Sequence, residues 1–114
     1  MKRLTFLLAA FAIVAAPAAQ AADKKIERLW KSKCGSCHGP DGKGDTEKGR
    51  KMKIGDLSDA AWQKKATDAD IKKSINEGVK SEKDGVKKEM DGYADDIKGE
   101  QLDALVAFVR DLKK

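Results

Sequence analysis

The two cysteines of the chain and its only histidine lie within five consecutive residues, Cys34-Gly35-Ser36-Cys37-His38. On a helix, positions i, i+3 and i+4 share one face, so the two thiols and the imidazole can meet a single flat group. This spacing is the attachment motif for c-type haem, in which the two sulfurs bond to the vinyl groups and the histidine becomes the proximal iron ligand. The motif therefore predicts one covalent haem c on Cys34, Cys37 and His38.

Two other uses of the same residues agree less well with the rest of the chain. A structural zinc site takes four Cys or His ligands, and the chain holds three such residues, so carboxylates would have to complete the shell. A thiol redox pair of the Cys-x-x-Cys type is expected on a βαβ scaffold, and the neighbouring sequence lacks the alternation typical of strands. Covalent haem is the interpretation that the sequence favours.

The sixth ligand of the iron must come from another residue type, because the sequence has no second histidine. The candidates are Met52, Met90, a lysine or solvent. A methionine thioether stabilises ferrous iron and raises the reduction potential, which suits an electron carrier. Met52 follows His38 by 14 residues and Met90 by 52, and the longer connection reaches the opposite face of a haem more easily. We therefore expect Met90, on a long charged loop at 79–92, to be the ligand, and Met52 to be a core or surface methionine.

The N-terminus has the organisation of a secretory signal peptide, residues 1–21. Two basic residues precede an apolar stretch at 6–16, and small residues surround a cleavage site after Ala21. An apolar core of 11 residues falls short of the roughly 20 that a membrane-spanning helix needs, so no stable membrane insertion is expected. The prediction is an exported, periplasmic protein whose residues 22–114 form one domain with a covalent haem.

The exported part has few apolar side chains with which to build an ordinary core. Leu, Ile, Val and Phe account for 15 of its 93 residues, near 16%, below the roughly 20% under which a charged chain is expected to be disordered. Real disorder, a disulfide framework or a large apolar cofactor would each explain this deficit. Two cysteines three positions apart make a weak disulfide framework, so the composition also favours haem.

The apolar spacing predicts helices at the two ends of the exported part. An amphipathic helix should run from about residue 26 into the motif, followed by a glycine-rich loop at 39–44. The last helix, about 99–113, has the clearest apolar stripe and should pack on the first. Lys98 would be its cap, and Ile97 would contact its first turns.

Capping signals predict two further helices between these ends. A short helix is expected after Ser58 as its cap. A second one is expected over 67–78, where Thr67 and Asp70 have the spacing of a capping box and Gly78 is a stop.

Together these features resemble the class I mono-haem c-type cytochromes, in particular the small soluble bacterial periplasmic kind. The resemblance covers essentially the whole exported part and is carried by Cys34-Gly35-Ser36-Cys37-His38-Gly39 with the glycine-rich loop after it, Asp56-Leu57 with Trp62, Lys87-Lys88-Glu89-Met90, and Leu102-Asp103-Ala104-Leu105-Val106-Ala107-Phe108-Val109-Arg110. It implies an all-α small cytochrome c fold, in which the first and last helices cross and a haem lies in a crevice. It also implies Cys34 and Cys37 as attachment points, His38 as proximal ligand and Met90 as distal ligand.

Iron held by His38 and Met90 keeps six ligands in both oxidation states and leaves no open position for a substrate. A Ser-His-Asp or similar catalytic arrangement is not available when the single histidine is committed to iron. The sequence therefore predicts a non-enzymatic, periplasmic carrier of one electron. The alternative is a haem-based ligand-binding or sensor protein with a labile Met90, which would let CO, NO or peroxide bind. A third alternative, a structural protein with an incidental motif, would bind no haem.

The formal net charge of +5 and the pI near 9.2 overstate how basic the exported part is. Beyond residue 21 there are 22 basic and 19 acidic side chains, a net +3, so nucleic acid is not an expected partner. Residues 31–53 carry a net +4 and residues 91–112 a net −4. If the basic stretch borders the haem, this dipole would orient a monomer toward redox partners with acidic docking surfaces. A solvated lysine-rich surface explains the same residues equally well.

Overall fold

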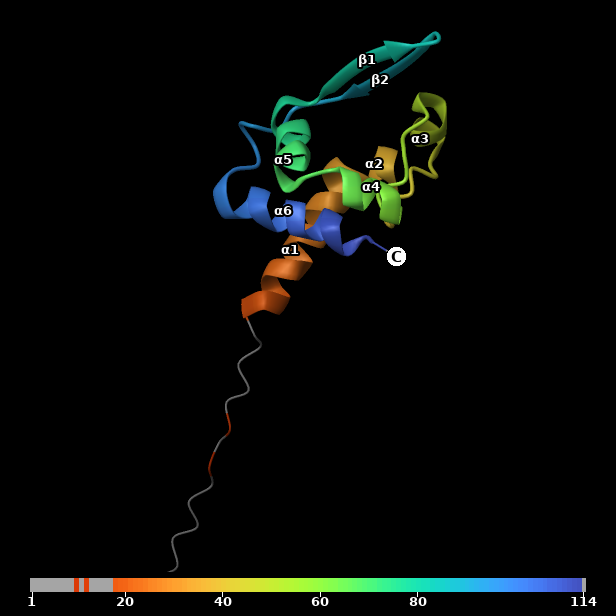
Figure 1. Ribbon diagram of the computed structural model, residues 1–114. Helices are drawn as coiled ribbons and strands as arrows, with labels where there is room; N and C mark the ends of the chain where they lie inside the picture. The colour runs from red at the N-terminus through yellow and green to blue at the C-terminus, as the bar shows by residue number, and fades with distance from the viewer. Residues whose placement is uncertain (1–9, 11, 13–17, 114) are drawn as a thin grey trace, which may run out of the picture.

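The computed structural model of the chain describes residues 10, 12 and 18–113. Within that part, six helices and two strands follow one another in the order α1, α2, α3, α4, α5, β1, β2 and α6 (Figure 1). The predicted signal peptide, residues 1–21, lies largely outside the described residues. None of the helices in the described part is both long and apolar enough to span a membrane.

The first and last helices cross and pack on each other, as the apolar stripes predict (Figure 1). α1 spans Ala18–Lys33 and α6 spans Gly99–Asp111. Trp30 and Phe108 meet between them, with ring centroids 5.2 Å apart. Buried apolar side chains, mostly from α1, α5 and α6, form one cluster: Ile26, Trp30, Cys34, Ile71, Ile75, Ile97, Leu102, Leu105, Val106 and Val109.

One helix begins and ends where the capping signals place it, and another begins at its predicted cap. α5 spans Asp68–Glu77 and is followed by the predicted stop, Gly78. Its capping box is complete, because the Thr67 hydroxyl accepts from the Asp70 N–H and the Asp70 carboxylate accepts from the Thr67 N–H. These bonds satisfy N–H groups that a helix start leaves unpaired. α6 likewise follows the predicted cap, Lys98.

The short helix α4, Ala60–Lys65, begins one residue later than its predicted cap implies. Asp59 is the cap, and its carboxylate accepts from the Trp62 N–H. Ser58 is instead buried, and its hydroxyl donates to Asp56 at 2.5 Å. The prediction of Ser58 as the cap was wrong because this hydroxyl is engaged in the preceding turn.

Two short helices surround the loop after the motif. α2, Gly35–His38, carries the end of the motif, and α3, Glu47–Met52, is absent from the predicted elements. Thr46 caps α3 and its hydroxyl donates to the Cys37 carbonyl at 2.7 Å, which ties the two helices together. The glycine-rich segment 39–44 between them is irregular, as predicted.

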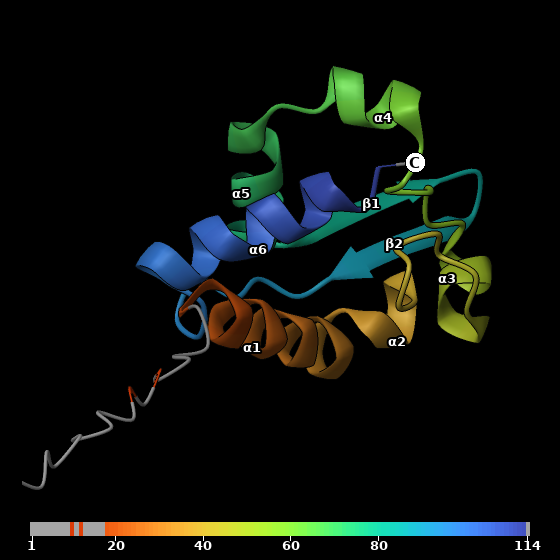
Figure 2. The ribbon, with the colours of Figure 1, turned by 90° about the horizontal axis from the view of Figure 1, so that it is seen from below.

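A β-hairpin stands where the sequence predicts a long loop. β1, Val79–Lys83, pairs antiparallel with β2, Val86–Met90, so Met90 ends the second strand at the base of the hairpin (Figure 2). Asp84 and Gly85 join the strands with φ values of 53° and 76°, the left-handed pair that a tight hairpin turn requires. The loop prediction was wrong because both faces of β1 are exposed, so its sequence has no alternation between apolar and polar residues.

Candidate functional site

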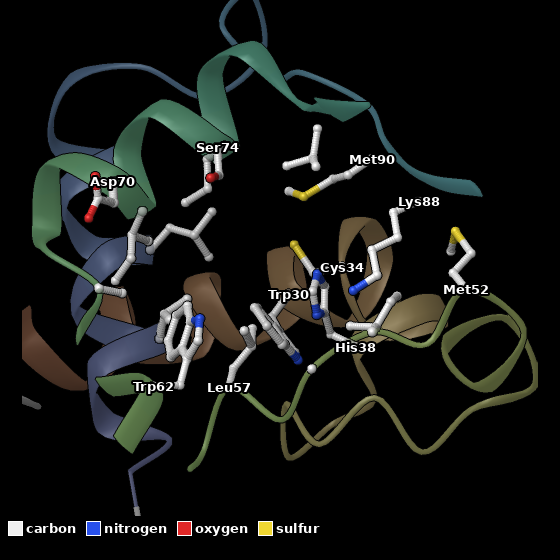
Figure 3. A pocket seen from close by; sticks show the side chains of 18 of the residues that line it. Trp30, Cys34, His38, Met52, Leu57, Trp62, Asp70, Ser74, Lys88 and Met90 are labelled. Atoms are coloured by element: carbon white, nitrogen blue, oxygen red, sulfur yellow. The ribbon is translucent and has the colours of Figure 1, made fainter. Parts of the chain in front are cut away.

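A mostly apolar cavity of about 370 Å³ lies between the motif, the hairpin and the helices α4 to α6. Its apolar walls come from residues far apart in the sequence: Trp30, Leu57, Trp62, Ile71, Ile75, Leu105 and Val109. Cys34 and His38 of the motif and Met90 of β2 line the same cavity (Figure 3). The structure therefore brings three of the four predicted site residues to one cavity, and the fourth, Cys37, lies half-buried in α2 beside them.

The backbone around His38 is held by several hydrogen bonds from other segments. The Trp30 indole N–H donates to the Gly39 carbonyl at 2.8 Å, and the Gly44 N–H donates to the His38 carbonyl at 2.8 Å. The Trp30 ring also packs against the imidazole, with centroids 5.7 Å apart and an interplanar angle of 36°. These contacts fix where the imidazole enters the cavity.

The two cysteines of the motif form no disulfide with each other. Burial, with the nearby Cys37 as a smaller cause, raises the pKa of the Cys34 thiol to about 11. A thiol with so high a pKa stays protonated at neutral pH and is a poor nucleophile. Cys34 thus lacks the activated thiolate of a redox-active cysteine, and neither sulfur is taken up in a disulfide.

The environment of His38 suits a metal ligand. Burial lowers the pKa of its imidazole, so the ring is neutral at physiological pH. Its Nδ1 atom is buried and has no hydrogen-bond partner among the described residues. A neutral imidazole keeps one nitrogen with a free lone pair, which a metal can take. Two free sulfurs and a neutral imidazole at an apolar cavity fit a covalently attached haem.

Both methionines after the motif line the cavity, but at different places. Figure 3 shows Met90 near Cys34 and His38, whereas Met52 lies to the far side of Lys88. Met90 packs against the buried apolar cluster, and Met52 is not among the described residues that do so. The geometry therefore favours Met90 over Met52 as the partner of His38. Met52 lines the cavity, which its prediction as a core or surface methionine did not include.

Lys88 is a cavity residue that the sequence analysis did not identify. It precedes Met90 by two positions on β2, so the two side chains share one face of the strand. Figure 3 shows its ammonium group directed toward His38. The Asp84-Gly85 turn could have identified Lys88. This turn predicts a hairpin, and in a strand that ends at Met90 the side chains of Lys88 and Met90 lie on the same face.

Comparisons with known proteins agree with this arrangement. The family model for cytochrome c matches residues 24–113. A solved structure described as the KustC0563 c-type cytochrome is 33% identical, with a TM-score of 0.64, over 77% of this chain and 96% of that chain. A mutant of Kustc0563 is 32% identical, with a TM-score of 0.62, over 77% of this chain and 98% of that chain. No curated protein sequence matches this chain.

The matched region contains the motif, the cavity and the hairpin, and thus every residue that this site requires. The two solved structures share the fold at an identity that extends beyond the motif. The chain therefore binds covalent haem c and is a haem-based electron-transfer protein with the small cytochrome c fold. It belongs to the cytochrome c family.

Proposed function

We propose that this protein is a periplasmic carrier of single electrons, with haem c attached to Cys34 and Cys37 and its iron ligated by His38 and Met90. The observation that carries the proposal is that His38 and Met90, 52 residues apart in the sequence, reach the same apolar cavity from α2 and β2. When bound, the haem supplies a one-electron redox couple.

His38, Met90 and the apolar walls of the cavity each contribute differently to electron transfer. His38 supplies a neutral imidazole whose backbone is already fixed, and Met90 supplies a neutral thioether that favours ferrous iron. The apolar walls limit the access of water, so charge on the cofactor is poorly screened and the potential is sensitive to the surrounding dipoles. Ligands that stay in place in both oxidation states leave no position for a substrate, which is why we propose a carrier and not an enzyme.

A haem-based ligand-binding or sensor protein is the second candidate, and one observation favours it. Met90 ends a hairpin whose first strand is exposed at every position, so few buried contacts hold the segment that carries this ligand. Segments with few buried contacts open at a low free-energy cost. A small ligand would take the position of Met90 if this segment opened.

The spectrum of the reduced holoprotein under carbon monoxide distinguishes the two candidates. A carrier keeps its spectrum, whereas the Met90→Ala variant gains the spectrum of a CO complex. Met52→Ala is the matched control, because Met52 lines the same cavity, and it should behave as the wild type. Wild-type protein that binds CO as readily as Met90→Ala would support the sensor, and CO binding by Met52→Ala alone would transfer the ligand role to Met52.

We propose further that the surface beside the cavity docks to acidic redox partners. α3 lies beside β2 (Figure 1), and Met52 from the end of α3 and Lys88 from β2 both line the cavity. The exposed basic residues in and directly after α3 are Lys48, Arg50, Lys51 and Lys53. A cluster of positive charge at the edge of a redox site raises the rate of encounter with anionic partners.

Ferricyanide is a suitable anionic probe of this surface. We expect its rate of oxidising the reduced holoprotein to fall as ionic strength rises, and to be lower in a Lys51→Glu/Lys53→Glu double variant. Lys24→Glu/Lys25→Glu, at two exposed positions of α1, is the control of equal charge change. If the rates respond neither to salt nor to the double variant, these basic residues form only a solvated lysine-rich surface that does not take part in docking.

Cell fractionation tests the proposed location. The haem-containing protein should be in the periplasmic fraction, and its mass should correspond to a chain that begins after Ala21. A haem-containing chain that keeps residues 1–21 and stays in the cytoplasm would contradict export.

A further inference from the structure

Tyr93 connects the segment that carries Met90 to the motif that carries His38. It lies three residues after Met90, in the loop between β2 and α6. Its hydroxyl donates to the Lys33 carbonyl at 3.1 Å. Lys33 is the last residue of α1 and directly precedes Cys34. One hydrogen bond thus spans 60 positions of sequence and joins the two sides of the cavity.

The backbone of Tyr93 is fixed as well as its side chain. Its N–H donates to the Ile75 carbonyl at 2.8 Å, and the next N–H, of Ala94, donates to Asn76 at 3.3 Å. Its carbonyl accepts from the Ile97 N–H at 2.8 Å, and its ring packs against the buried apolar cluster. Tyr93 is therefore a rigid point from which the chain extends back to Met90.

The phenol is a dependable donor at physiological pH. Burial is the main cause that raises the pKa of the Tyr93 phenol above its ordinary value of 10. The hydroxyl therefore keeps its proton at neutral pH and can donate a hydrogen bond to the Lys33 carbonyl.

Met90 itself packs against the buried apolar cluster, but the rest of the hairpin makes few buried contacts. Every side chain of β1 is exposed, and in β2 only the first and last side chains are partly buried. Asp91, directly after Met90, is exposed. The first residue after Met90 whose side chain bonds to another part of the described chain is Tyr93.

We propose that Tyr93 is a positioning residue for the distal ligand: its hydrogen bond to Lys33 holds the Met90 segment against the haem-binding motif and slows the departure of Met90. This inference rests on the proposed role of Met90 as the iron ligand. The effect of this bond is transmitted to Met90 through the two residues between them, Asp91 and Gly92.

Cyanide binding to the ferric holoprotein tests the proposal, because cyanide must displace the distal ligand. Tyr93→Phe removes the hydroxyl and keeps the ring. We expect cyanide to bind about three- to tenfold faster, as the loss of one hydrogen bond implies. The charge-transfer band of methionine-ligated ferric haem should also weaken. Ser32→Ala is the matched control, because it removes a hydroxyl bond to the Leu29 carbonyl within α1 that joins nothing to the distal side.

Four results would have different meanings. Fast cyanide binding in Tyr93→Phe with an unchanged rate in Ser32→Ala supports the proposal. Equal rates in wild type and Tyr93→Phe, with Met90→Ala fast, overturn it and leave Met90 as the ligand. Slow binding in Met90→Ala overturns the ligand assignment itself. A thermal midpoint lowered equally in Tyr93→Phe and Ser32→Ala, without a change in cyanide rate, would show a merely structural bond.

Discussion

The two sides of the cavity are built differently. On the side of His38, bonds from Trp30, Gly44 and Thr46 hold the carbonyls of three successive residues, Cys37 to Gly39. On the side of Met90, a two-stranded hairpin extends from the helical body with its side chains mostly in water. The two proposed iron ligands are therefore held with unequal firmness. The difference teaches that His38 is held by the packed helical body, whereas Met90 can respond to local opening.

The largest expected effect is at Trp30, which anchors the proximal side. Trp30→Ala removes a buried indole and should lower the free energy of unfolding of the holoprotein by about 4 kcal/mol. Trp30→Phe keeps a ring against His38 and Phe108 but leaves the Gly39 carbonyl without its donor, at a cost of about 1–2 kcal/mol. Urea unfolding followed by circular dichroism measures both. If Trp30→Phe were as stable as the wild type, the indole bond would contribute nothing to the firmness of this side.

Gly49→Ala should be almost as damaging, for a steric reason. A Cβ atom on Gly49 would lie 2.6 Å from the Cys37 carbonyl oxygen and still closer to that of Gly44, so the backbone around the motif must shift. We expect a loss of about 3 kcal/mol and a reduced yield of holoprotein. Gly35→Ala, in the same region, is the control, because its Cβ would make only an ordinary 3.4 Å contact. Equal haem contents for the two variants would show that the proximal side is looser than its hydrogen bonds indicate.

Gly85→Ala should have a smaller effect that stays on the distal side. The residue has a φ of 76°, which alanine adopts at a cost of about 1 kcal/mol, and its Cβ would meet no other atom. Amide exchange should rise in β1 and β2, while the urea midpoint of the whole protein hardly changes. Asp84→Asn keeps a residue type that tolerates the left-handed conformation and serves as the control. A midpoint that falls by the full local cost would mean that the hairpin unfolds together with the helices.

The smallest effect is expected at Asp70, which belongs to neither side. Hydrogen bonds from the Thr67 backbone and then its side chain lower the pKa of the Asp70 carboxyl below its ordinary value of 3.8. The charged form is therefore stabilised by folding, and this contribution is present above pH 3.8 and lost as the pH falls through the lower folded value. Asp70→Asn should have a slightly lower urea midpoint than the wild type at pH 7, and the difference should shrink on acidification. Asp95→Asn, at an exposed loop position, is the matched control for the loss of one carboxylate.

The sequence predicted the proximal side well because its chemistry is local. Two cysteines and a histidine within five residues identify their own partner, and Thr67, Asp70 and Gly78 mark the ends of α5 without help from the rest of the fold. The distal side depends on tertiary structure, so the sequence could favour Met90 only by its separation from His38.

The hairpin and α3 escaped prediction for a related physical reason. Helices and strands are recognised by apolar residues that repeat on one face. β1 has no buried face, and α3 is six residues long with a single buried position, Gly49. The Asp84-Gly85 pair does signal a turn, but the segments on either side of it are too polar to be recognised as strands.

The backbone segments that enter and leave the hairpin lie close together at its base. A Cβ atom on Gly78 would lie 2.7 Å from the Gly92 nitrogen, and one on Gly92 would lie 2.5 Å from the Asn76 carbonyl oxygen. The two ends of the segment between these glycines are thus already in contact. Because side chains alternate along a strand, removing or adding residues at the tip in matched pairs keeps Met90 on the same face. The tip of the hairpin is therefore where the chain can change in length over evolution without rebuilding the helical body.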